Sequence, residues 1–409
     1  MKRILLTILG VTALFTGMCG CNRVQSQAGS ELTIATLFES PYLTLAAQRY
    51  EALHEGTTIT IKAYSTKEGQ QLTDTEIYSQ YINTALMSGL GEDIIDVRRL
   101  AWVHLADKGK LFDMQGAIEW EKEDYYQNIL DAFIYNSGRY ATPLNFNFDA
   151  FTFSDAYNDI AIPDRVTSDW LVTMVQKNPD APLFRSSSSM SPTALAFRLF
   201  LLDFQWYVDV GTKDAYIDNE RFINLLESIQ SISSNLRGPA QGESSLMLQL
   251  IMYNAVSSTG WVEDYQELFL LGNEDGKGLF STIEFLPAIN ANSKNKELAI
   301  DFIRFLLSAE MQASPELMYC PVNRTAAADI AATMFAETKQ LGFDVGNFDL
   351  AKNMILFDAL AEQLNVVEYS DFVLTGFVYD ELARFFAGEV NAAQAAKNLQ
   401  ARLNTYLKE

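Results

Sequence analysis

Side chains suited to binding a polar ligand follow two apolar segments near the start of this 409-residue chain. Phe38 and Glu39 come directly after the first segment, and Asp96 and Arg98 come after the second. An aromatic ring packs against the apolar face of a ligand, whereas carboxylate and guanidinium groups form hydrogen bonds with its polar atoms. In α/β proteins, ligands bind just beyond the carboxyl ends of strands. The residue types and their positions therefore predict non-covalent binding at a strand edge.

Sequence patterns of the common hydrolases are missing. There is no Gly-x-Ser-x-Gly, no His-Glu-x-x-His and no glycine-rich phosphate loop. The two histidines, His54 and His104, fall in predicted amphipathic helices, where a histidine is usually structural. The chain has 52 acidic residues, so some pair will always look like a glycosidase pair, and the count decides nothing. We expect no catalytic residue, no cofactor and no bound metal.

The elements that must position these side chains alternate between strands and helices. Composition predicts strands over 32–37, 58–64 and 93–97. Apolar spacing predicts helices over 43–53 and 77–87, between those strands. This alternation is typical of an α/β lobe with a mostly parallel sheet.

The later part of the chain is predominantly helical. A further strand is predicted over 140–148, with Pro143 near its start, which suits a crossover between lobes. Residues 167–236 are predicted to be mainly helical, and residues 246–257 to be a helix running into a strand. The last sixty or so residues are predicted to form helices, with apolar positions that end in Leu399, Leu403 and Tyr406.

The first 21 residues have the pattern of an export signal. Lys2 and Arg3 precede an apolar run over 4–15, which is shorter than the roughly 20 residues that span a bilayer. Gly20-Cys21 at the end of the run resembles a bacterial lipoprotein site, although Cys19 is a second possible acceptor. We therefore predict a signal over 1–20, lipidation of Cys21 and a tether over 21–30. Plain secretion is the alternative.

Composition excludes several classes of partner. A formal net charge of −22 argues against binding to nucleic acid or to an anionic membrane surface. The length exceeds that of one ordinary core, so two lobes are expected. If Cys21 carries lipid and Cys19 is removed, only Cys320 remains, and no disulfide can form within the chain. Cys320 is predicted to be a buried, unreactive residue.

Several segments together resemble one protein family in their order and spacing. The segments are residues 88–96, 106–111, 138–143, 289–312 and 386–389. Through them the chain resembles the extracellular solute-binding proteins of ABC importers, in the carbohydrate-binding group that includes maltose-binding protein. Ile300 stands where relatives often have tryptophan, a change that concerns the packing of one helix.

The resemblance implies an α/β fold of two lobes, the type II periplasmic-binding-protein-like fold, with the ligand cleft between lobes joined by crossover strands. It implies an N-terminal lobe of residues 31–142 and about 265–322. The C-terminal lobe comprises residues 143–264 and 323–409. It also implies capture of a sugar or oligosaccharide by lobe closure, without catalysis.

Cleft candidates combine the strand-end positions with those that the resemblance implies. Serines precede a predicted helix, one tryptophan follows a glycine, and a late loop carries another aromatic residue. The ligand-binding candidates are Phe38, Glu39, Asp96, Arg98, Trp102, Asn145, Asn147, Phe148, Ser187, Ser188, Trp261, Tyr369 and Asp371. Three alternatives stay open here: Trp102 as a core residue, Arg98 as part of a structural ion pair, and Ser187 and Ser188 as a loop and helix cap.

The expected partners are a small-molecule ligand, probed first as a carbohydrate, and the subunits of an ABC permease. We expect a monomer held by its lipid at the outer face of the cell membrane or in the periplasm, with no nucleic acid bound. Two alternative functions are also compatible with the export signal. One is a ligand-sensing lipoprotein that feeds a signalling partner, and the other is an exported glycoside hydrolase.

Overall fold

The structure is a computed structural model, and the part of the chain that it describes has several gaps. It covers residues 30–65, 71–120, 124–153, 166–183, 190–236, 247–251, 269–270, 272–273, 278–342, 349–369 and 371–408. The predicted lipidation site Cys21 and the cleft candidates Ser187, Ser188 and Trp261 lie outside these residues.

A four-stranded sheet forms the centre of the N-terminal lobe. Its strands, in the order β13-β3-β1-β2, are β13 (Pro287–Ile289), β3 (Ile94–Asp96), β1 (Ser30–Phe38) and β2 (Thr57–Ser65). β1 pairs with β2 and β3 in parallel, whereas β13 runs antiparallel to β3. The predicted strands and the parallel sheet are therefore confirmed.

Helices pack on this sheet and connect its strands. They are α1 (Pro41–Leu53), α2 (Gln71–Met87), α3 (Trp102–Asp107), α10 (Lys296–Leu307) and α11 (Ala309–Gln312). α1 begins where the sequence favours it: Pro41 occupies the first turn, and the Ser40 hydroxyl accepts the Leu43 N–H at 3.0 Å. This cap turns the chain sharply at the carboxyl end of β1, beside Phe38 and Glu39.

The C-terminal lobe is mainly helical. Its helices are α5 (Ser168–Lys177), α6 (Pro192–Leu202), α7 (Phe204–Tyr207), α8 (Glu220–Ser231), η3 (Ser233–Leu236), α14 (Phe372–Phe386) and α15 (Ala392–Lys408). Two small sheets accompany them, one of β7 (Asp149–Phe153), β10 (Met247–Ile251) and β11 (Phe269–Leu270), the other of β8 (Val208–Asp209) and β9 (Asp214–Ala215). The helical prediction for 167–236 and for the last sixty residues is confirmed. Of residues 246–257, predicted to be a helix that runs into a strand, residues 247–251 form a strand that pairs antiparallel with β7, so the helix is wrong there. The other residues of this segment lie outside the described part of the chain.

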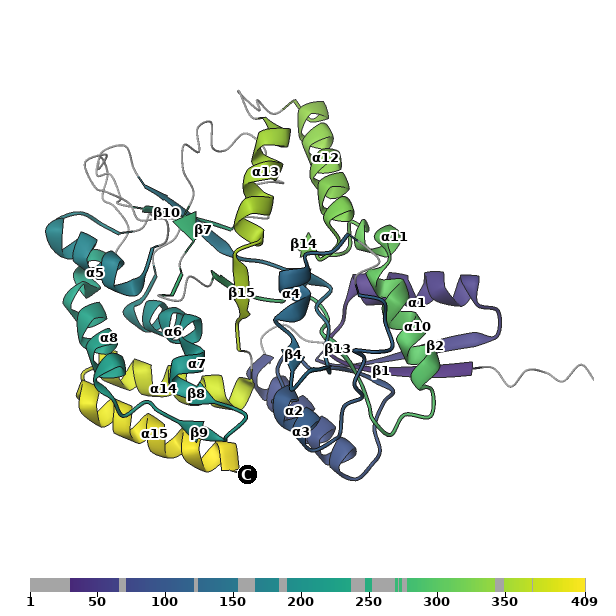
Figure 1. Cartoon of the computed structure of the whole chain (residues 1–409), viewed down its shortest axis with the longest axis horizontal. Helices are drawn as coiled ribbons and strands as arrows, with labels where there is room; N and C mark the ends of the chain where they lie inside the picture. The colour runs from purple at the N-terminus through teal and green to yellow at the C-terminus, as the bar shows by residue number, and fades with distance from the viewer. Residues whose placement is uncertain are drawn as a thin grey trace, which may run out of the picture.

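Short elements lie between the two groups of helices, and two longer helices, α12 (Arg324–Gln340) and α13 (Leu350–Ala361), rise above them (Figure 1). The short elements are α4 (Gln127–Asp131), β4 (Ile134–Tyr135), β5 (Gly138–Arg139), β6 (Asn145–Phe146), β12 (Gly278–Phe280), β14 (Cys320–Pro321) and β15 (Leu364–Val367). The single strand predicted over 140–148 is interrupted. Pro143 has no N–H to donate to a ladder, and only Asn145 and Phe146 pair, with β14.

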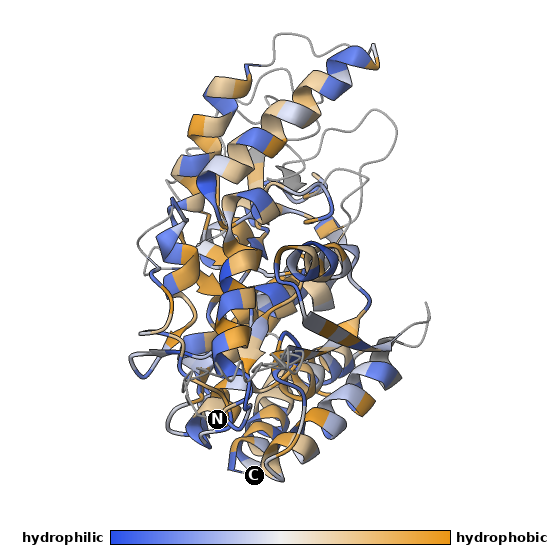
Figure 2. Cartoon of the chain, turned by 90° about the vertical axis from the view of Figure 1, so that its right-hand side faces the viewer, coloured by the Kyte–Doolittle hydropathy of each residue, from blue (hydrophilic) through white to orange (hydrophobic). Residues whose placement is uncertain are grey.

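Two apolar clusters form the cores. The first surrounds the four-stranded sheet and includes crossover residues such as Phe146 and Leu364, and the second joins α5, α6, α8, α14 and α15. The helices show apolar and hydrophilic stripes side by side (Figure 2), as helices that bury one face do. The lobe boundaries proposed above stay a prediction. In the described part of the chain, no helix is both long and apolar enough to cross a bilayer.

Cys320 and Trp120, which are not cleft candidates, are both buried. Cys320 is 1% exposed and a free thiol, as predicted. Trp120 is buried as well. The guanidinium of Arg139 lies 4.5 Å from the centre of the Trp120 ring, and this cation–π contact makes the ring a packing surface for a buried charge.

Candidate functional site

Asp96 at the end of β3 is the anchor of the strand-end cluster. Its side chain is 1% exposed, and it accepts hydrogen bonds from Arg98 Nε at 3.0 Å and Nη2 at 2.7 Å. It also accepts the backbone N–H of Leu286 at 3.3 Å. Burial alone would lower the pKa of Arg98. The negative charge of Asp96 and its hydrogen bonds have the larger combined effect, so the pKa of Arg98 is raised. Asp96 therefore fixes Arg98 in its charged form.

Phe38 and Glu284 lie beside this ion pair. The Arg98 guanidinium lies 6.0 Å from the centre of the half-buried Phe38 ring, and Glu39 is exposed. Glu284 accepts the Ser40 hydroxyl at 2.5 Å, which joins the end of β1 to the segment before β13. The structure thus brings Phe38, Asp96 and Arg98 together, as their positions at strand ends predicted.

The crossover candidates Asn145 and Phe148 are buried. Asn145 donates through Nδ2 to the Met318 carbonyl at 2.5 Å, and its Oδ1 accepts the Glu284 N–H at 3.2 Å. Phe148 is 2% exposed and packs 5.5 Å from the Phe357 ring. Asn147 is half-buried and exchanges backbone hydrogen bonds with Ser281 at 2.9 Å. Asn145 and Phe148 hold the crossover, while Asn147 keeps partial access to solvent.

Trp102 takes the core position that was left open as its alternative. Its side chain is 9% exposed and belongs to the first apolar cluster, 6.1 Å from the ring of Phe133. α3 begins at Trp102, so this ring fixes the helix that carries His104 and Lys108.

Tyr369 and Asp371 lie on the segment that leads into α14. The Tyr369 ring stacks on Phe204 with centroids 4.3 Å apart, which attaches the segment to the C-terminal lobe. Asp371 is 2% exposed, caps α14 by accepting the Val373 N–H at 3.0 Å, and accepts the Tyr406 hydroxyl at 2.9 Å. Burial raises the pKa of the Asp371 carboxyl, and these hydrogen bonds offset only part of that effect.

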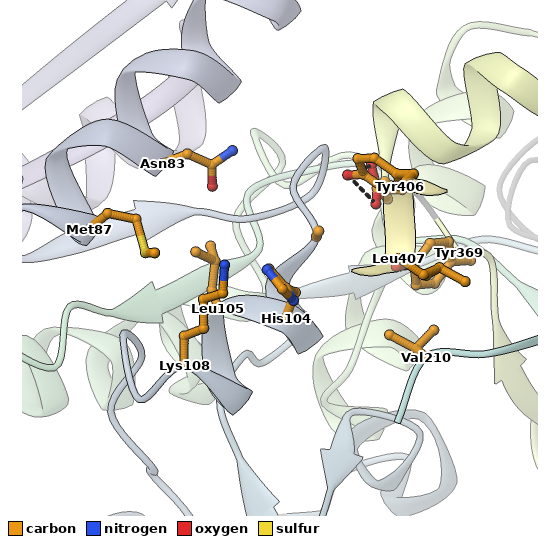
Figure 3. Close-up of a pocket in the computed structure, with 11 residues that line it drawn as sticks. Asn83, Met87, His104, Leu105, Lys108, Val210, Tyr369, Tyr406 and Leu407 are labelled. Carbon is orange, nitrogen blue, oxygen red and sulfur yellow. Dashed lines mark hydrogen bonds between the residues drawn. The ribbon is translucent and has the colours of Figure 1, made fainter. Parts of the chain in front are cut away.

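A pocket of about 210 Å³ lies between the two lobes beside this segment (Figure 3). One wall comes from α2 and α3, and the other comes from the Tyr369 segment, the end of α15 and the turn after β8. Its lining residues are Asn83, Met87, Ala101, His104, Leu105, Lys108, Val210, Tyr369, Asp371, Tyr406 and Leu407. The volume is below the roughly 300–1,000 Å³ typical of ligand pockets, so a larger ligand requires the lobes to move apart.

The lobes also touch at the end of β3. The Phe372 N–H, at the start of α14, donates to the Arg99 carbonyl at 3.3 Å. Arg99 and Arg198 both act electrostatically on Glu368, and Arg198 forms an ion pair with Asp149. Charged groups from the loop after β3, from α6 and from the crossover therefore meet where the lobes join.

Sequence reasoning missed Glu368, Arg198 and the pocket position of His104. Glu368 is one of 52 acidic residues and Arg198 one of 30 basic ones, and no motif singles them out. His104 was interpreted as a structural helix residue, yet it lines the pocket. Burial lowers the pKa of His104, with Lys108 and Lys213 adding to the effect. These three residues can be singled out only from the fold, which brings them to the junction of the lobes.

Replacing Glu368 by glutamine is expected to change how stability depends on pH. Burial raises the pKa of Glu368 above its ordinary value of 4.5, so the folded state binds the proton more tightly than the unfolded state. Relative to Glu368→Gln, the wild type should be most stable below about pH 4.5 and should lose that advantage as the pH rises through the raised pKa. Urea unfolding of both proteins between pH 4 and pH 8 measures the difference.

Glu316→Gln is the control for this prediction. The exposed Glu316 carboxylate accepts the Ser314 hydroxyl, which lowers its pKa, so its small contribution should be lost as the pH falls instead. A wild-type advantage over Glu368→Gln that grows with rising pH would show that the arginines, and not burial, dominate at Glu368.

Several solved structures share this architecture. An ABC substrate-binding protein from Listeria monocytogenes in complex with cycloalternan aligns with 14% identity and a TM-score of 0.57, over 93% of this chain and 99% of that one. The GacH receptor of Streptomyces glaucescens, solved unliganded and with acarbose, aligns with 15% identity and a TM-score of 0.54, over 93% of this chain and 99% of that one. A solute-binding protein from Thermotoga lettingae bound with α-D-tagatose aligns with 14% identity and a TM-score of 0.52, over 92% of this chain and 100% of that one. No family model and no curated protein sequence matches the chain.

These likenesses establish the fold. The chain has the α/β architecture of type II solute-binding proteins, as the sequence resemblance predicted, and it spans nearly the whole length of each solved relative. The roles of the individual cleft candidates stay predictions.

Proposed function

We propose that this protein is an extracytoplasmic solute-binding receptor that captures a sugar or oligosaccharide between its lobes. The observation that carries the proposal is the pocket between the lobes, in a chain with the fold of sugar-binding proteins of ABC importers. A ligand held by both walls stabilises the closed arrangement, because each lobe then contributes contacts that the open arrangement lacks.

The chemistry of the lining supports a ligand with both polar and apolar faces. Tyr369 and Tyr406 offer aromatic rings, and Leu105 and Leu407 offer apolar contact. Asn83 can both donate and accept hydrogen bonds, which suits hydroxyl groups. Sugars combine hydroxyls with flat C–H faces, so a site of this composition fits them.

Within this proposal the strand-end residues have two roles. Phe38, Glu39, Arg98 and Asn147 do not line the pocket, but they keep some exposure and are assigned to contacts with the part of a ligand that extends beyond it. Asp96 and Asn145 are assigned to holding that surface in place, because their polar atoms are engaged inside the protein. Ser187, Ser188 and Trp261 remain candidates from the sequence for the same cleft.

We further propose that Cys21 carries a lipid, that residues 21–30 tether the receptor to the membrane surface and that the closed complex delivers its ligand to an ABC permease. The signal-like N-terminus supports the first two steps. A tether raises the local concentration of receptor near its permease, which favours docking.

Binding without turnover is the expected result of a direct test. Purified protein is heated with maltotriose, xylotriose, cycloalternan, tagatose or ribitol, and the products are analysed after incubation. A sugar at one hundred times its Kd should add about 2.7 kcal/mol to the free energy of unfolding and raise the Tm. No oligosaccharide should be cleaved. Sustained turnover of a glycoside, or a ligand response confined to peptides or polyamines, would contradict the proposal.

A further inference from the structure

An apolar groove of about 600 Å³ runs along the surface of α12. One wall is the segment 313–319, which follows α11, and the other is the face of α12 from Asp329 to Glu337. Leu317 and Ile330 are the buried residues at its base, 2% and 8% exposed. Among the described residues, this α12 groove shares no lining side chain with the pocket between the lobes, so the proposed function leaves it without a role.

Two methionine side chains of the groove are exposed to solvent. Met318 is 55% exposed on one wall, and Met334 is 36% exposed on the other. Single exposed apolar residues are common on protein surfaces, whereas apolar residues that gather in a groove mark a site of interaction. Methionine is unbranched and polarizable, so it adapts to apolar partners of different shape. The groove is therefore suited to receive apolar side chains of another molecule.

Both walls are fixed by contacts outside the groove. The Met318 carbonyl accepts Asn145 Nδ2 of the crossover at 2.5 Å, and α12 packs on the first apolar cluster through Ala327 and Ile330. Tyr319, which lines the groove, has a φ of +65°, a conformation that a residue other than glycine adopts only with strain. Such strain persists where the surrounding structure dictates the backbone. The groove is thus formed before anything binds, which lowers the cost of binding.

The rim of the groove is acidic. Asp329 and Glu337 are exposed carboxylates that lie two turns apart on one face of α12. Glu316 is a third exposed carboxylate, between the lining residues Pro315 and Leu317 in the sequence. Among the described residues that line the groove, none is basic. The complementary occupant therefore has apolar side chains for the base and lysine or arginine side chains for the rim.

The acidic rim and the helical wall argue against three other occupants. An anionic membrane surface would be repelled by the carboxylates. A second copy of this chain, in a two-fold symmetric contact, would bring Asp329 and Glu337 close to the same residues of its partner. An added β-strand needs free backbone groups, and α12 uses its own within the helix.

We propose that the α12 groove is a docking site for an amphipathic helix of a partner protein, with apolar side chains along one face and lysine or arginine residues beside them. The α12 wall from Asp329 to Glu337 is about 12 Å long, which matches two turns of a docked helix. Two turns present apolar anchors at positions i, i+3 or i+4, and i+7. The inference goes beyond the proposed function, because this docking requires no sugar.

A synthetic peptide tests the proposal on the purified protein. The peptide has about fourteen residues, or four helical turns, with leucine along one face and lysine along the other. We expect a micromolar Kd at about 0.15 M salt, measured by the fluorescence anisotropy of the labelled peptide. A second peptide, with serine at every leucine position and the same charge, should bind at least tenfold more weakly.

Two double variants separate the apolar from the charged contribution. Met318→Ser with Met334→Ser should weaken binding of the leucine peptide at least tenfold. Asp329→Asn with Glu337→Gln should weaken it about threefold to fivefold at about 0.05 M salt, and the difference should fade at about 0.5 M salt. All four side chains have solvent-exposed surface, so far-ultraviolet circular dichroism and Tm should stay close to those of the wild type.

Matched controls make the same chemical changes away from the groove. Leu90→Ser with Ile355→Ser removes two apolar side chains that are 68% and 72% exposed. Asp218→Asn with Glu227→Gln removes two exposed carboxylates. Both controls should bind the leucine peptide within about twofold of the wild type.

Methionine methyl signals in nuclear magnetic resonance spectra locate the bound peptide. The Met318 and Met334 signals, assigned from Met318→Leu and Met334→Leu, should shift as the leucine peptide is added. Absence of peptide binding, or equal affinity of the wild type and the methionine double variant, would overturn the inference. So would a wild-type dimer, seen by sedimentation, that the same variant dissociates, or binding of the groove to phosphatidylcholine vesicles. Peptide binding by a protein that binds no sugar would leave the docking site standing while the proposed function fails.

Discussion

Replacing Asp96 by alanine is expected to lower the free energy of unfolding by about 3 kcal/mol, because it leaves the mostly buried Arg98 charge without its partner. Asp96 also holds the Leu286 N–H at the start of the segment that forms β13. Asparagine should rescue little of this loss, since its amide would direct a donor toward the guanidinium donors of Arg98. Urea unfolding at pH 7 measures both variants.

Asp214→Asn is the control for Asp96. Asp214 pairs with Lys408 at 3.7 Å, but the two side chains are 44% and 62% exposed, so losing that pair should cost less than about 1 kcal/mol. An Asp96→Ala variant that is as stable as Asp214→Asn would show that Arg98 finds water or another partner. In that case Asp96 would not be the anchor of the strand-end cluster.

Asp371 is almost as deeply buried as Asp96, but the stability of the protein should be less sensitive to its replacement by asparagine. Alanine at this position removes the cap of α14 and the acceptor of the Tyr406 hydroxyl, with an expected loss of about 2–3 kcal/mol. Asparagine should cost less than about 1 kcal/mol, because it caps helices well and accepts the same hydroxyl. Burial already raises the pKa of Asp371, so removing its charge relieves a desolvation cost. Thermal and urea unfolding distinguish the two variants.

The same two variants also report on ligand binding. Asp371 lines the pocket beside Tyr369, so the alanine variant should bind sugar at least tenfold more weakly, while the asparagine variant should stay close to the wild type. Asp349→Ala removes the exposed cap of α13 and should cost about 1 kcal/mol without changing affinity. Equal losses for Asp371→Asn and Asp371→Ala would show that the negative charge, and not the cap, is what matters.

Positions at strand ends were predictable because they follow from local patterns. The apolar runs that form β1 and β3 are short and bounded, so the residues after them had to emerge at one sheet edge, and Phe38, Asp96 and Arg98 do. The partner of each side chain was not predictable in the same way. Asn145 is engaged by Met318 and Glu284, whose sequence separations of 173 and 139 residues leave no trace in a local pattern.

The lobe junction was the least predictable part. Glu368, Arg99 and Arg198 come from three distant segments, and only the fold makes one acidic residue out of 52 distinctive.

The antiparallel strand β13 has a consequence for the order in which the chain can fold. β13 pairs with β3 across 191 to 195 residues, from Asp96 with Pro287 to Ile94 with Ile289, so the N-terminal sheet stays incomplete until most of the chain has been synthesised. The C-terminal lobe also waits, because α14 and α15 close its core from the very end of the sequence. A nascent chain can therefore complete neither lobe until most of its residues have been synthesised.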